Sequence, residues 1–410
     1  MITRLFTSEH VSPGHPDKIC DQISDSILDY HYKLSPKTST RVACEAMVKD
    51  DHVIVAGEIT SPDRVITYRP IVSDVLEDLG YVSKVSPKFC DSNYQLTQLI
   101  SRQSQDIASC VDDNTELGAG DQGIMFGYAV CEAPDYTGWC HYIARNIVSE
   151  IWKIKRLDDL VGEPCICPDY KVQVTMEYTS SKPVLKTVLV SASHIKEKDP
   201  DEFRAAMKYL VDNIITRLAD EQSWDIDISD YDILINPYGP FTIFGPIADS
   251  GLTGRKIVCD QYGGYAPVGG GAFSGKDLTK VDRTAAYMAR FIAKNFLHRY
   301  RKIQSSAKTV KPHDCSVEVA YIIGQAMPVS VNVTVEYEDG RRRSIDPSYV
   351  MDTVFSDGVT PEGKTLYDIF KPENIIKNLN LFDVDYSEVS KFGHIGQDTS
   401  HTVKPWEVLI

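Results

Sequence analysis

Four short segments of the chain combine glycines with charged residues that can bind phosphate or metal ions. The first runs from Gly14 to Lys18 and contains Pro16, which suits the first position of a helix. The helical N–H groups beyond Pro16 favour an anion. His15 and Lys18 can contact phosphate, and Asp17 can hold Mg²⁺. Taken alone, the motif fits a decorated helix cap equally well.

The second segment, Gly118 to Gly123, has three glycines in six residues around Asp121. Such a backbone is typical of positive φ angles or of close approach to a ligand, although a plain glycine turn remains an alternative. It follows a polar stretch from Ser101 to Thr115 with few signs of helix or strand. Long loops of this kind often serve as lids over a binding site.

The third segment runs from Asp249 to Lys256 and ends in the cation pair of Arg255 and Lys256. On a glycine-flanked loop this pair suits a polyphosphate, because Arg binds bidentately and Lys acts as a point charge. A solvated surface charge pair is the other interpretation.

The fourth segment runs from Gly269 to Asp282 and resembles a phosphate-binding loop that leads into a helix. It is not a Walker A motif, because Asp277 follows the lysine where that motif needs Ser or Thr. Ser274 and Asp277 have the spacing of a capping box. Lys276 and Lys280 are predicted to share a helix face, where they repel unless an anion lies between them. This spacing favours a functional role.

Together the four segments supply cations, carboxylates and glycines, but no Ser–His–Asp order or Cys–His pair that would indicate covalent catalysis. They suit a large polyanion bound together with a divalent metal.

Elements that could position these segments follow a repeating pattern. Alternating apolar residues and turn signals predict three hairpins, at Val42–Thr60, Lys171–Ser191 and Ser316–Tyr337. A predicted helix precedes each hairpin, at Asp17–Leu34, Thr137–Lys155 and Asp277–Tyr300. Another follows each one, at Asp63–Leu79, Asp201–Glu221 and Pro347–Phe355, the middle one with Asp199 as its cap.

This pattern predicts an α+β protein of three related units, each a small sheet with helices on one face. We expect boundaries near Asp113 and Asn236, which gives an N-terminal domain 1–112, a central domain 113–236 and a C-terminal domain 237–410.

Composition narrows the possible partners. The 410 residues are 42% apolar and carry a net charge of −15, which argues against binding a nucleic-acid polymer. We find neither a secretory signal nor an apolar run that could span a bilayer, so no membrane partner is expected. The ten cysteines are scattered, as in a reduced cytoplasmic protein. The only basic run, Arg341 to Arg343, is predicted to be a solvated loop.

The four segments, in this order, resemble those of S-adenosylmethionine synthases. The matching strings are GHPDK, GAGDQG, GLTGRK and GGGAFSGKD followed by KVDR, with ACE, GEIT and PWE elsewhere, so the resemblance covers nearly the whole chain. It implies three intertwined domains related by a pseudo-threefold axis. It also implies a homodimer or a dimer of dimers, with active sites between the subunits.

The implied reaction transfers the adenosyl group of ATP to the sulfur of L-methionine by in-line displacement, and then hydrolyses the triphosphate to pyrophosphate and phosphate. The resemblance implies two Mg²⁺ ions per site, held by Asp17 and Asp282, and one K⁺ ion, held with the help of Glu45. The stretch after Ser101 resembles a mobile gate.

Roles for other residues are implied in the same way. The implied catalytic residues are His15, Lys171, Arg255 and Lys276. The implied ATP-binding residues are these four together with Asp169, Phe241, Asp249, Lys256 and Ala272. The implied methionine-binding residues are Glu58, Gln103, Asp121, Asp249 and Lys280.

The chain departs from the usual family pattern at Pro13, Gln105, Cys167, Pro240, Phe244 and Val268. We expect Phe244 to fill space that Val268 leaves in the nucleotide pocket; independent changes at the pocket edge are the alternative. The departures also leave open a catalytically altered paralogue that serves as a binding subunit. A different ATP-using enzyme, such as a kinase, would release ADP, which a synthase does not.

Overall fold

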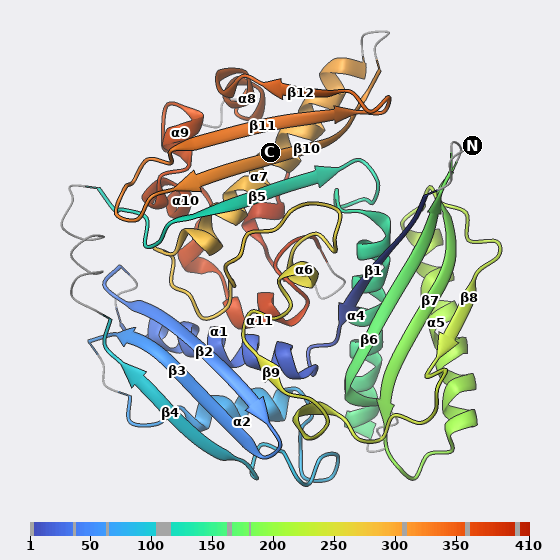
Figure 1. Cartoon of the computed structure of the whole chain (residues 1–410). Helices are drawn as coiled ribbons and strands as arrows, with labels where there is room; N and C mark the ends of the chain where they lie inside the picture. Colours follow the sequence, from blue (N-terminus) through green and yellow to red (C-terminus); the bar gives the residue numbers. More distant parts are fainter. Residues whose placement is uncertain are drawn as a thin grey trace.

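A computed structural model describes residues 4–35, 38–62, 65–103, 116–161, 166–179, 182–305, 310–356, 361–397 and 402–410; the side chains of 156–161 and 305 are not described. Within these residues the strands form three sheets of four strands each (Figure 1). This is the expected α+β architecture of three units.

The N-terminal sheet has the strand order β4-β3-β2-β9. Its central hairpin consists of β2 (Arg41–Lys49) and β3 (His52–Thr60), with β4 (Gln95–Ser101) parallel to β3 and β9 (Gly251–Leu252) antiparallel to β2. Helix α1 (Pro16–Leu34) precedes the hairpin and α2 (Arg69–Asp78) follows it.

The central sheet has the order β1-β6-β7-β8. Its strands are β1 (Arg4–Val11), β6 (Ile166–Tyr178), β7 (Val184–His194) and β8 (Asp232–Ile235). Helix α4 (Trp139–Val161) precedes the hairpin, and α5 (Pro200–Glu221) follows it. The α5 N-terminus is capped as expected, because the Asp199 carboxylate accepts from the N–H groups of Asp201 and Glu202.

The C-terminal sheet has the order β12-β11-β10-β5. Its strands are β5 (Gly123–Val130), β10 (Pro312–Tyr321), β11 (Ser330–Tyr337) and β12 (Arg342–Ile345). Helix α7 (Val281–Ser305) precedes the hairpin, and α8 (Pro347–Val354) follows β12. The shorter elements are 3₁₀ helices η1 (Gly245–Ile247), η2 (Leu381–Asp383) and η3 (Pro405–Glu407), and helices α6 (Ile257–Asp260), α9 (Leu366–Ile369), α10 (Pro372–Asn378) and α11 (Tyr386–Lys391).

Each sheet receives one edge strand from a distant part of the chain. The N-terminal strand β1 pairs with β6, β5 pairs with β10, and β9 pairs with β2, in each case antiparallel to the first strand of the hairpin. The three units are therefore intertwined and share one plan. The boundaries near Asp113 and Asn236 stay a prediction, because the strand exchange crosses both of them.

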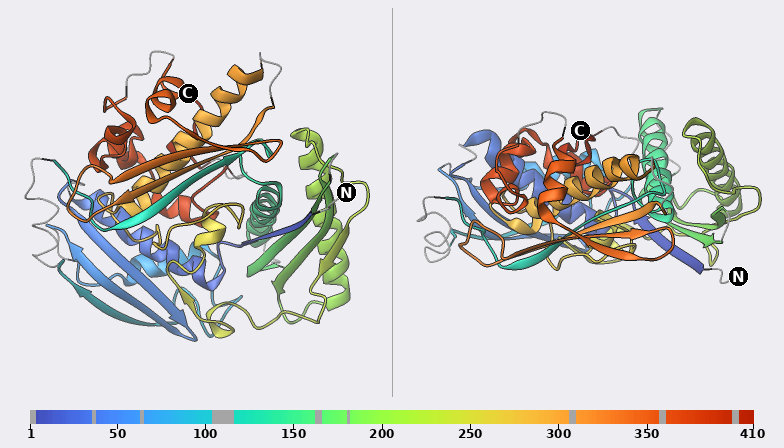
Figure 2. Two further views of the ribbon diagram at one scale, coloured as in Figure 1. Left: turned by 45° about the horizontal axis from the view of Figure 1, so that its top comes forward. Right: turned by 90° about the horizontal axis from the view of Figure 1, so that it is seen from above.

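The sheets lie on one side of the molecule and most helices lie on the other (Figure 2). We call the uncovered side of the three sheets the open face. Along β2 and β6, buried residues such as Val42 and Val172 alternate with more exposed ones such as Glu45 and Lys171, so the latter project from the open face. No helix in the described part of the chain is long and apolar enough to cross a membrane.

Three local expectations were wrong. Helix α2 begins at Arg69 rather than Asp63, with a proline in its first turn. Helix α7 begins at Val281 rather than Asp277. The Arg341–Arg343 run is not simply a loop, since Arg342 and Arg343 belong to the exposed edge strand β12, where the Arg342 guanidinium pairs with Glu336 of β11.

Candidate active site

A first cluster of candidate residues lies where α1 begins, between the N-terminal and central sheets. His15 is the N-cap of α1, and its Nδ1 accepts from the Asp17 N–H at 3.2 Å. The Asp17 carboxylate accepts from the Leu252 N–H of β9 at 3.0 Å and from Lys256 Nζ at 2.5 Å. Arg255 Nε lies 3.7 Å from the same carboxylate. The GHPDK and GLTGRK segments therefore meet at Asp17.

Burial and lysines set the charge states in this cluster. Burial, followed by the Lys256 ammonium, lowers the pKa of His15 to about 3. Burial opposes ionisation of Asp17, but the Lys256 ammonium and the Leu252 N–H hold the pKa of Asp17 below its ordinary value. The cluster thus presents a neutral imidazole beside a carboxylate that is already paired with a cation.

Asp169 and Lys171 border the first cluster from β6. Asp169 is 5% exposed, and its Oδ2 accepts from the Gly245 N–H at 2.9 Å. Burial raises the pKa of Asp169 to about 6, opposed by the Gly245 N–H and by the Lys171 ammonium. Asp249 also lies close enough to influence this carboxyl electrostatically.

The expectation that Lys18 contacts phosphate was wrong. Its ammonium is 1% exposed and donates to Asp21 at 2.9 Å and to Asp260 at 2.7 Å. Lys18 therefore neutralises Asp21 of α1 and Asp260 of α6 instead of facing a ligand. Sequence reasoning missed Asp260, since no pattern links it to a residue so far away in the chain.

A second cluster lines a pocket of about 260 Å³ on β2, β3 and the loop before α7. Glu45, Glu58, Ala272 and Lys276 all line this pocket. Lys276 Nζ donates to Asp282 Oδ2 at 2.6 Å, so this cluster also contains a lysine bound to a carboxylate. The two clusters adjoin where Gly254 approaches Ala272: a Cβ built at Gly254 would lie 2.5 Å from the Ala272 Cβ.

Lys276 and Lys280 do not share a helix face, because α7 begins only after both of them. Lys280 is buried and pairs with Asp277 instead. The capping box expected between Ser274 and Asp277 is also wrong, since the Asp277 carboxylate accepts from the N–H groups of Val42 and Thr279. The two lysines thus lie in separate ion pairs on the loop before α7.

The glycines mostly allow close contact between backbone segments. A Cβ at Gly118 would lie 2.5 Å from the Gly324 carbonyl oxygen, and neither Gly118 nor Gly120 has a positive φ. A Cβ at Gly271 would lie 2.1 Å from the Asp282 carboxyl carbon. The GGGAF loop therefore passes directly over the carboxylate that we expect to bind metal.

The remaining predicted residues border these clusters. Asp121 is exposed and follows Gly120, whose N–H donates to the Thr279 carbonyl beside Lys280. The Gln103 N–H donates to Thr60 Oγ1 at 3.2 Å, near Glu58. Phe241 is partly buried, and its carbonyl accepts from the His194 N–H. Most of the expected gate, residues 104–115, lies outside the described residues, as does the Gln105 departure.

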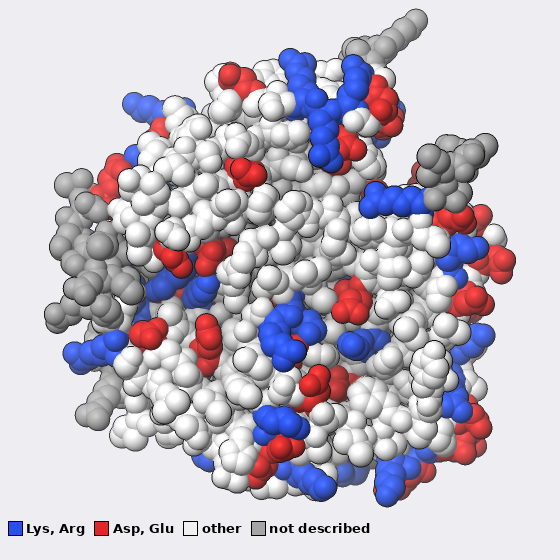
Figure 3. Space-filling model, viewed as in Figure 1, with Lys and Arg blue, Asp and Glu red and all other residues white. Residues whose placement is uncertain are grey.

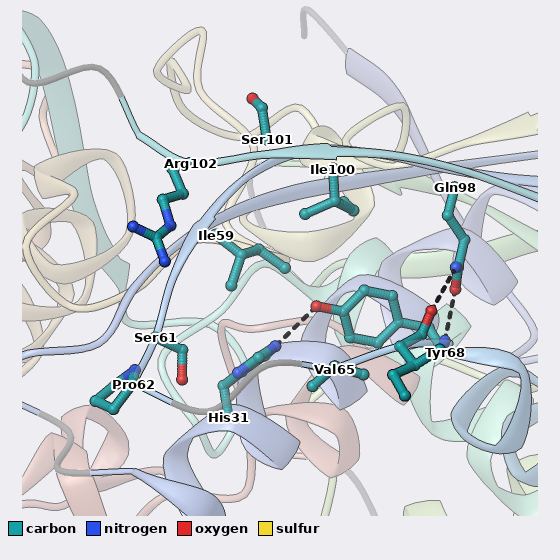
Figure 4. Close-up of a pocket in the computed structure, with 11 residues that line it drawn as sticks. His31, Ile59, Ser61, Pro62, Val65, Tyr68, Gln98, Ile100, Ser101 and Arg102 are labelled. Atoms are coloured by element: carbon teal, nitrogen blue, oxygen red, sulfur yellow. Dashed lines mark hydrogen bonds between the residues drawn. The ribbon is translucent and has the colours of Figure 1, made fainter.

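A separate pocket of about 470 Å³ lies beside the segment that leads to Gln103 (Figure 4). Tyr68 joins its walls: its hydroxyl is 2.9 Å from His31 Nε2, and its N–H donates to Gln98 Oε1 at 2.5 Å. Through Tyr68, these bonds connect the middle of β4 with α1. None of the residues with a predicted role in binding or catalysis lines this pocket.

The structure gives Phe244 a partner other than Val268. Its ring packs against Tyr81, with centroids 6.2 Å apart. Val268 precedes Gly269, where a Cβ would lie 2.8 Å from the Ile124 carbonyl of β5. The contacts on record thus involve different segments, and the coupling that we expected between Phe244 and Val268 stays a prediction.

Comparison with known proteins places the chain among enzymes of one type. Family models for S-adenosylmethionine synthetase match in succession: the N-terminal domain over residues 3–105, the central domain over 116–241 and the C-terminal domain over 243–408. Curated proteins named S-adenosylmethionine synthase are similar along their whole length. The protein of Mycoplasmopsis pulmonis is 39% identical, over 100% of this chain and 97% of its own. Those of Petrotoga mobilis and Clostridium tetani are each 38% identical, over 99% of this chain and 96% and 97% of their own.

Proposed function

Since the chain belongs to the S-adenosylmethionine synthetase family and is a methionine adenosyltransferase, we propose that both clusters bind the triphosphate of ATP during in-line attack by methionine. The observation that carries this proposal is the presence in each cluster of a lysine paired with a carboxylate, Lys256 with Asp17 and Lys276 with Asp282. Polyphosphate can replace the carboxylate as the partner of the lysine, which leaves the carboxylate free for a metal ion.

The chemistry needs cations more than a base. The methionine thioether is a neutral nucleophile with no proton to lose, whereas the leaving triphosphate carries increasing negative charge. Rate enhancement therefore comes from alignment of the sulfur, the 5′ carbon and the leaving oxygen, and from fixed positive charge near that oxygen. Lys171, Arg255 and Lys276 supply such charge, and His15, neutral at working pH, offers a ring nitrogen for hydrogen bonding. Hydrolysis of the triphosphate to pyrophosphate and phosphate would use the same cations.

For the adenosine and methionine ends of the site we propose the roles that the family resemblance implies. We assign ATP binding to Asp169, Phe241, Asp249, Lys256 and Ala272 in addition to the four catalytic residues. Glu58 is assigned to the methionine ammonium group and Lys280 to the methionine carboxylate, with Gln103, Asp121 and Asp249 alongside. Glu58 has an exposed carboxylate and lines the pocket of the second cluster, which supports this assignment.

The donor set fits Mg²⁺ bound jointly by protein and substrate. No group of three or more His, Cys, Asp or Glu side chains in the described residues converges as a metal cage. Mg²⁺ commonly takes one or two carboxylates and completes its shell with phosphate oxygens and water. Asp17 and Asp282 would each hold one Mg²⁺, which neutralises triphosphate charge, and Glu45 on the open face would help to hold K⁺.

We further propose a homodimer, or a dimer of dimers, with active sites between the subunits. The open face of the sheets is largely uncharged, and its charged groups gather in the central belt between the sheets and at the rim (Figure 3). In a twofold-symmetric interface, one part of a face meets a different part of the same face on the partner. Such packing would bring the first cluster of one subunit opposite the second cluster of the other. Seven described cysteines are free thiols, which suits a reducing compartment such as the cytoplasm; they are Cys20, Cys44, Cys90, Cys131, Cys140, Cys259 and Cys315.

The test is to incubate the protein with ATP, methionine, Mg²⁺ and K⁺ and to identify the products. We expect S-adenosylmethionine, pyrophosphate and phosphate, with no activity in excess chelator. Formation of ADP would show a kinase or ATPase instead, and binding of ATP and methionine without turnover would indicate an altered paralogue.

A further inference from the structure

Tyr81 lies behind the first cluster but belongs to none of the motifs that predicted the site. It sits in the connection between α2 and β4, with no exposed surface. Its N–H donates to the Leu76 carbonyl and its own carbonyl accepts from the Asp91 N–H, each at 2.9 Å. The ring packs against Phe89 and Phe244, with centroids 5.7 and 6.2 Å away. The position of the Tyr81 hydroxyl is therefore closely fixed.

The Tyr81 hydroxyl donates to the carbonyl oxygen of Gly14 at 2.7 Å. Gly14 directly precedes His15, and its other side is in contact with Pro168, where a Cβ on Gly14 would lie only 2.4 Å from the proline Cβ. The peptide that leads into His15 is thus held between a hydrogen bond and a proline ring. Burial keeps the pKa of Tyr81 well above its ordinary value, so the hydroxyl retains its proton.

The same hydroxyl contacts a second segment of the site. Gly245 has a φ of +63°, and a Cβ there would lie 2.5 Å from the Tyr81 hydroxyl oxygen. The Gly245 N–H donates to Asp169 Oδ2 at 2.9 Å. Tyr81 therefore lies against both backbone segments that set the relative positions of His15 and Asp169.

We propose that Tyr81 is a positioning residue for adenosyl transfer, because its hydroxyl fixes the Gly14 carbonyl and thereby the His15 ring relative to Asp169. The adjacent Phe244 ring restricts rotation of the Tyr81 ring. The inference rests on the proposed roles of His15 and Asp169. It adds a residue from the connection between α2 and β4 to the residues already assigned to the site.

The test compares Tyr81→Phe with a matched control, Tyr321→Phe. Tyr321 is also buried, and its hydroxyl donates to the Phe370 carbonyl at 2.6 Å, but it lies in the C-terminal sheet. Both variants lose one buried hydrogen bond, so we expect similar falls in thermal unfolding temperature. Tyr81→Phe should lower kcat about 10- to 100-fold with the methionine KM nearly unchanged, because small misplacements of reacting groups have effects of this size. Tyr321→Phe should leave both constants unchanged.

A second readout distinguishes positioning from general stability. Histidine-selective NMR, with His15 assigned through His15→Asn, should show a shifted His15 signal in Tyr81→Phe and an unshifted one in Tyr321→Phe. Should Tyr81→Phe fail to fold, Phe244→Leu keeps the hydroxyl but loosens the ring, and it should lower kcat in the same way by a smaller factor. An active parent enzyme whose kcat and His15 signal are unaffected by these changes would overturn the inference. An inactive parent enzyme would instead contradict the proposed function.

Discussion

Lys276 forms an ion pair that substrate binding must rearrange. Its ammonium lies 2.6 Å from Asp282 Oδ2, and both groups are assigned to the triphosphate and its metal ion. We predict that Lys276→Ala lowers kcat by about 10²–10³-fold, because the leaving-group charge that it faces grows in the transition state. The methionine KM should change little in steady-state assays. Lys153→Ala, at an exposed pair with Glu150, is the control. A rise in the methionine KM alone would remove Lys276 from the phosphate site.

The ionised Asp169 carboxylate should lower the free energy of unfolding at neutral pH. Its folded pKa is about 6, against an ordinary 3.8, so the folded state binds the proton more tightly than the unfolded state does. The free energy of unfolding therefore falls as the pH rises from about 4 to 6, by up to about 3 kcal/mol. We predict that Asp169→Asn raises the unfolding temperature at pH 8 but not at pH 4, and raises the KM for ATP. Equal effects of the substitution at both pH values would contradict this account.

His15 should remain neutral throughout the working pH range. Burial and Lys256 lower its pKa to about 3, so protonation would require conditions far more acidic than any normal assay. We predict that the His15 NMR signal keeps its neutral-imidazole position from pH 8 down to pH 5. Titration of His15 near pH 6 would show that the ring is less buried in solution.

At the scale of the element, η3 anchors the end of the chain to α7. Glu407 accepts from Arg290 at 2.9 Å through both carboxylate oxygens and from Lys294 at 2.8 Å, with all three side chains buried. The Trp406 ring stacks on Tyr287 with centroids 3.7 Å apart. Burial opposes ionisation, yet Arg290 and Lys294 hold the pKa of Glu407 far below its ordinary value.

We predict that Glu407→Gln lowers the free energy of unfolding by about 3–5 kcal/mol, because it leaves buried cations without a counter-charge. Chemical denaturation with matched m-values measures the change. Glu373→Gln, which breaks an exposed pair with Lys377, should cost less than about 0.5 kcal/mol. A similarly small effect at Glu407 would show that the anchor depends on Trp406 stacking alone.

Elements with a clear periodic pattern of apolar residues could be predicted from the sequence. Elements that form only because another part of the chain lies beside them could not. The hairpin of β2 and β3 alternates strongly, and α5 has a cap, a proline and an acidic first turn. Strand β9 has only two residues and exists because β2 lies beside it. The motif segments indicated the candidate residues, but the pairing of Lys18 with Asp260 depends on residues far apart in sequence. Tyr81 carries no local signal, since its proposed role comes from contacts with Gly14 and Gly245, which lie far from it in the sequence.

At the scale of the whole molecule, an active site shared between subunits can be tested with dimers that contain two different variants. Lys256→Ala and Lys276→Ala should each abolish most activity alone. If the site combines the first cluster of one subunit with the second cluster of the other, a dimer of the two variants has one intact site. Random assortment from co-expression should then restore about a quarter of the parent activity per protein, since half of the dimers are mixed and each has one working site. No recovery would show that both lysines serve a site within one subunit.

The exchange of edge strands also determines when the chain can fold during its synthesis. Strand β1 can pair only after β6 has been synthesised, and β2 has no outer neighbour until Leu252 of β9 has been made. Strand β5 can pair only after β10, which ends at Tyr321. Until its partner has been synthesised, each of these strands has an unpaired backbone edge, which can pair with other nascent chains. No unit can complete its sheet from its own contiguous segment. The period in which the emerging polypeptide needs shielding from aggregation therefore lasts until about four-fifths of it has left the ribosome.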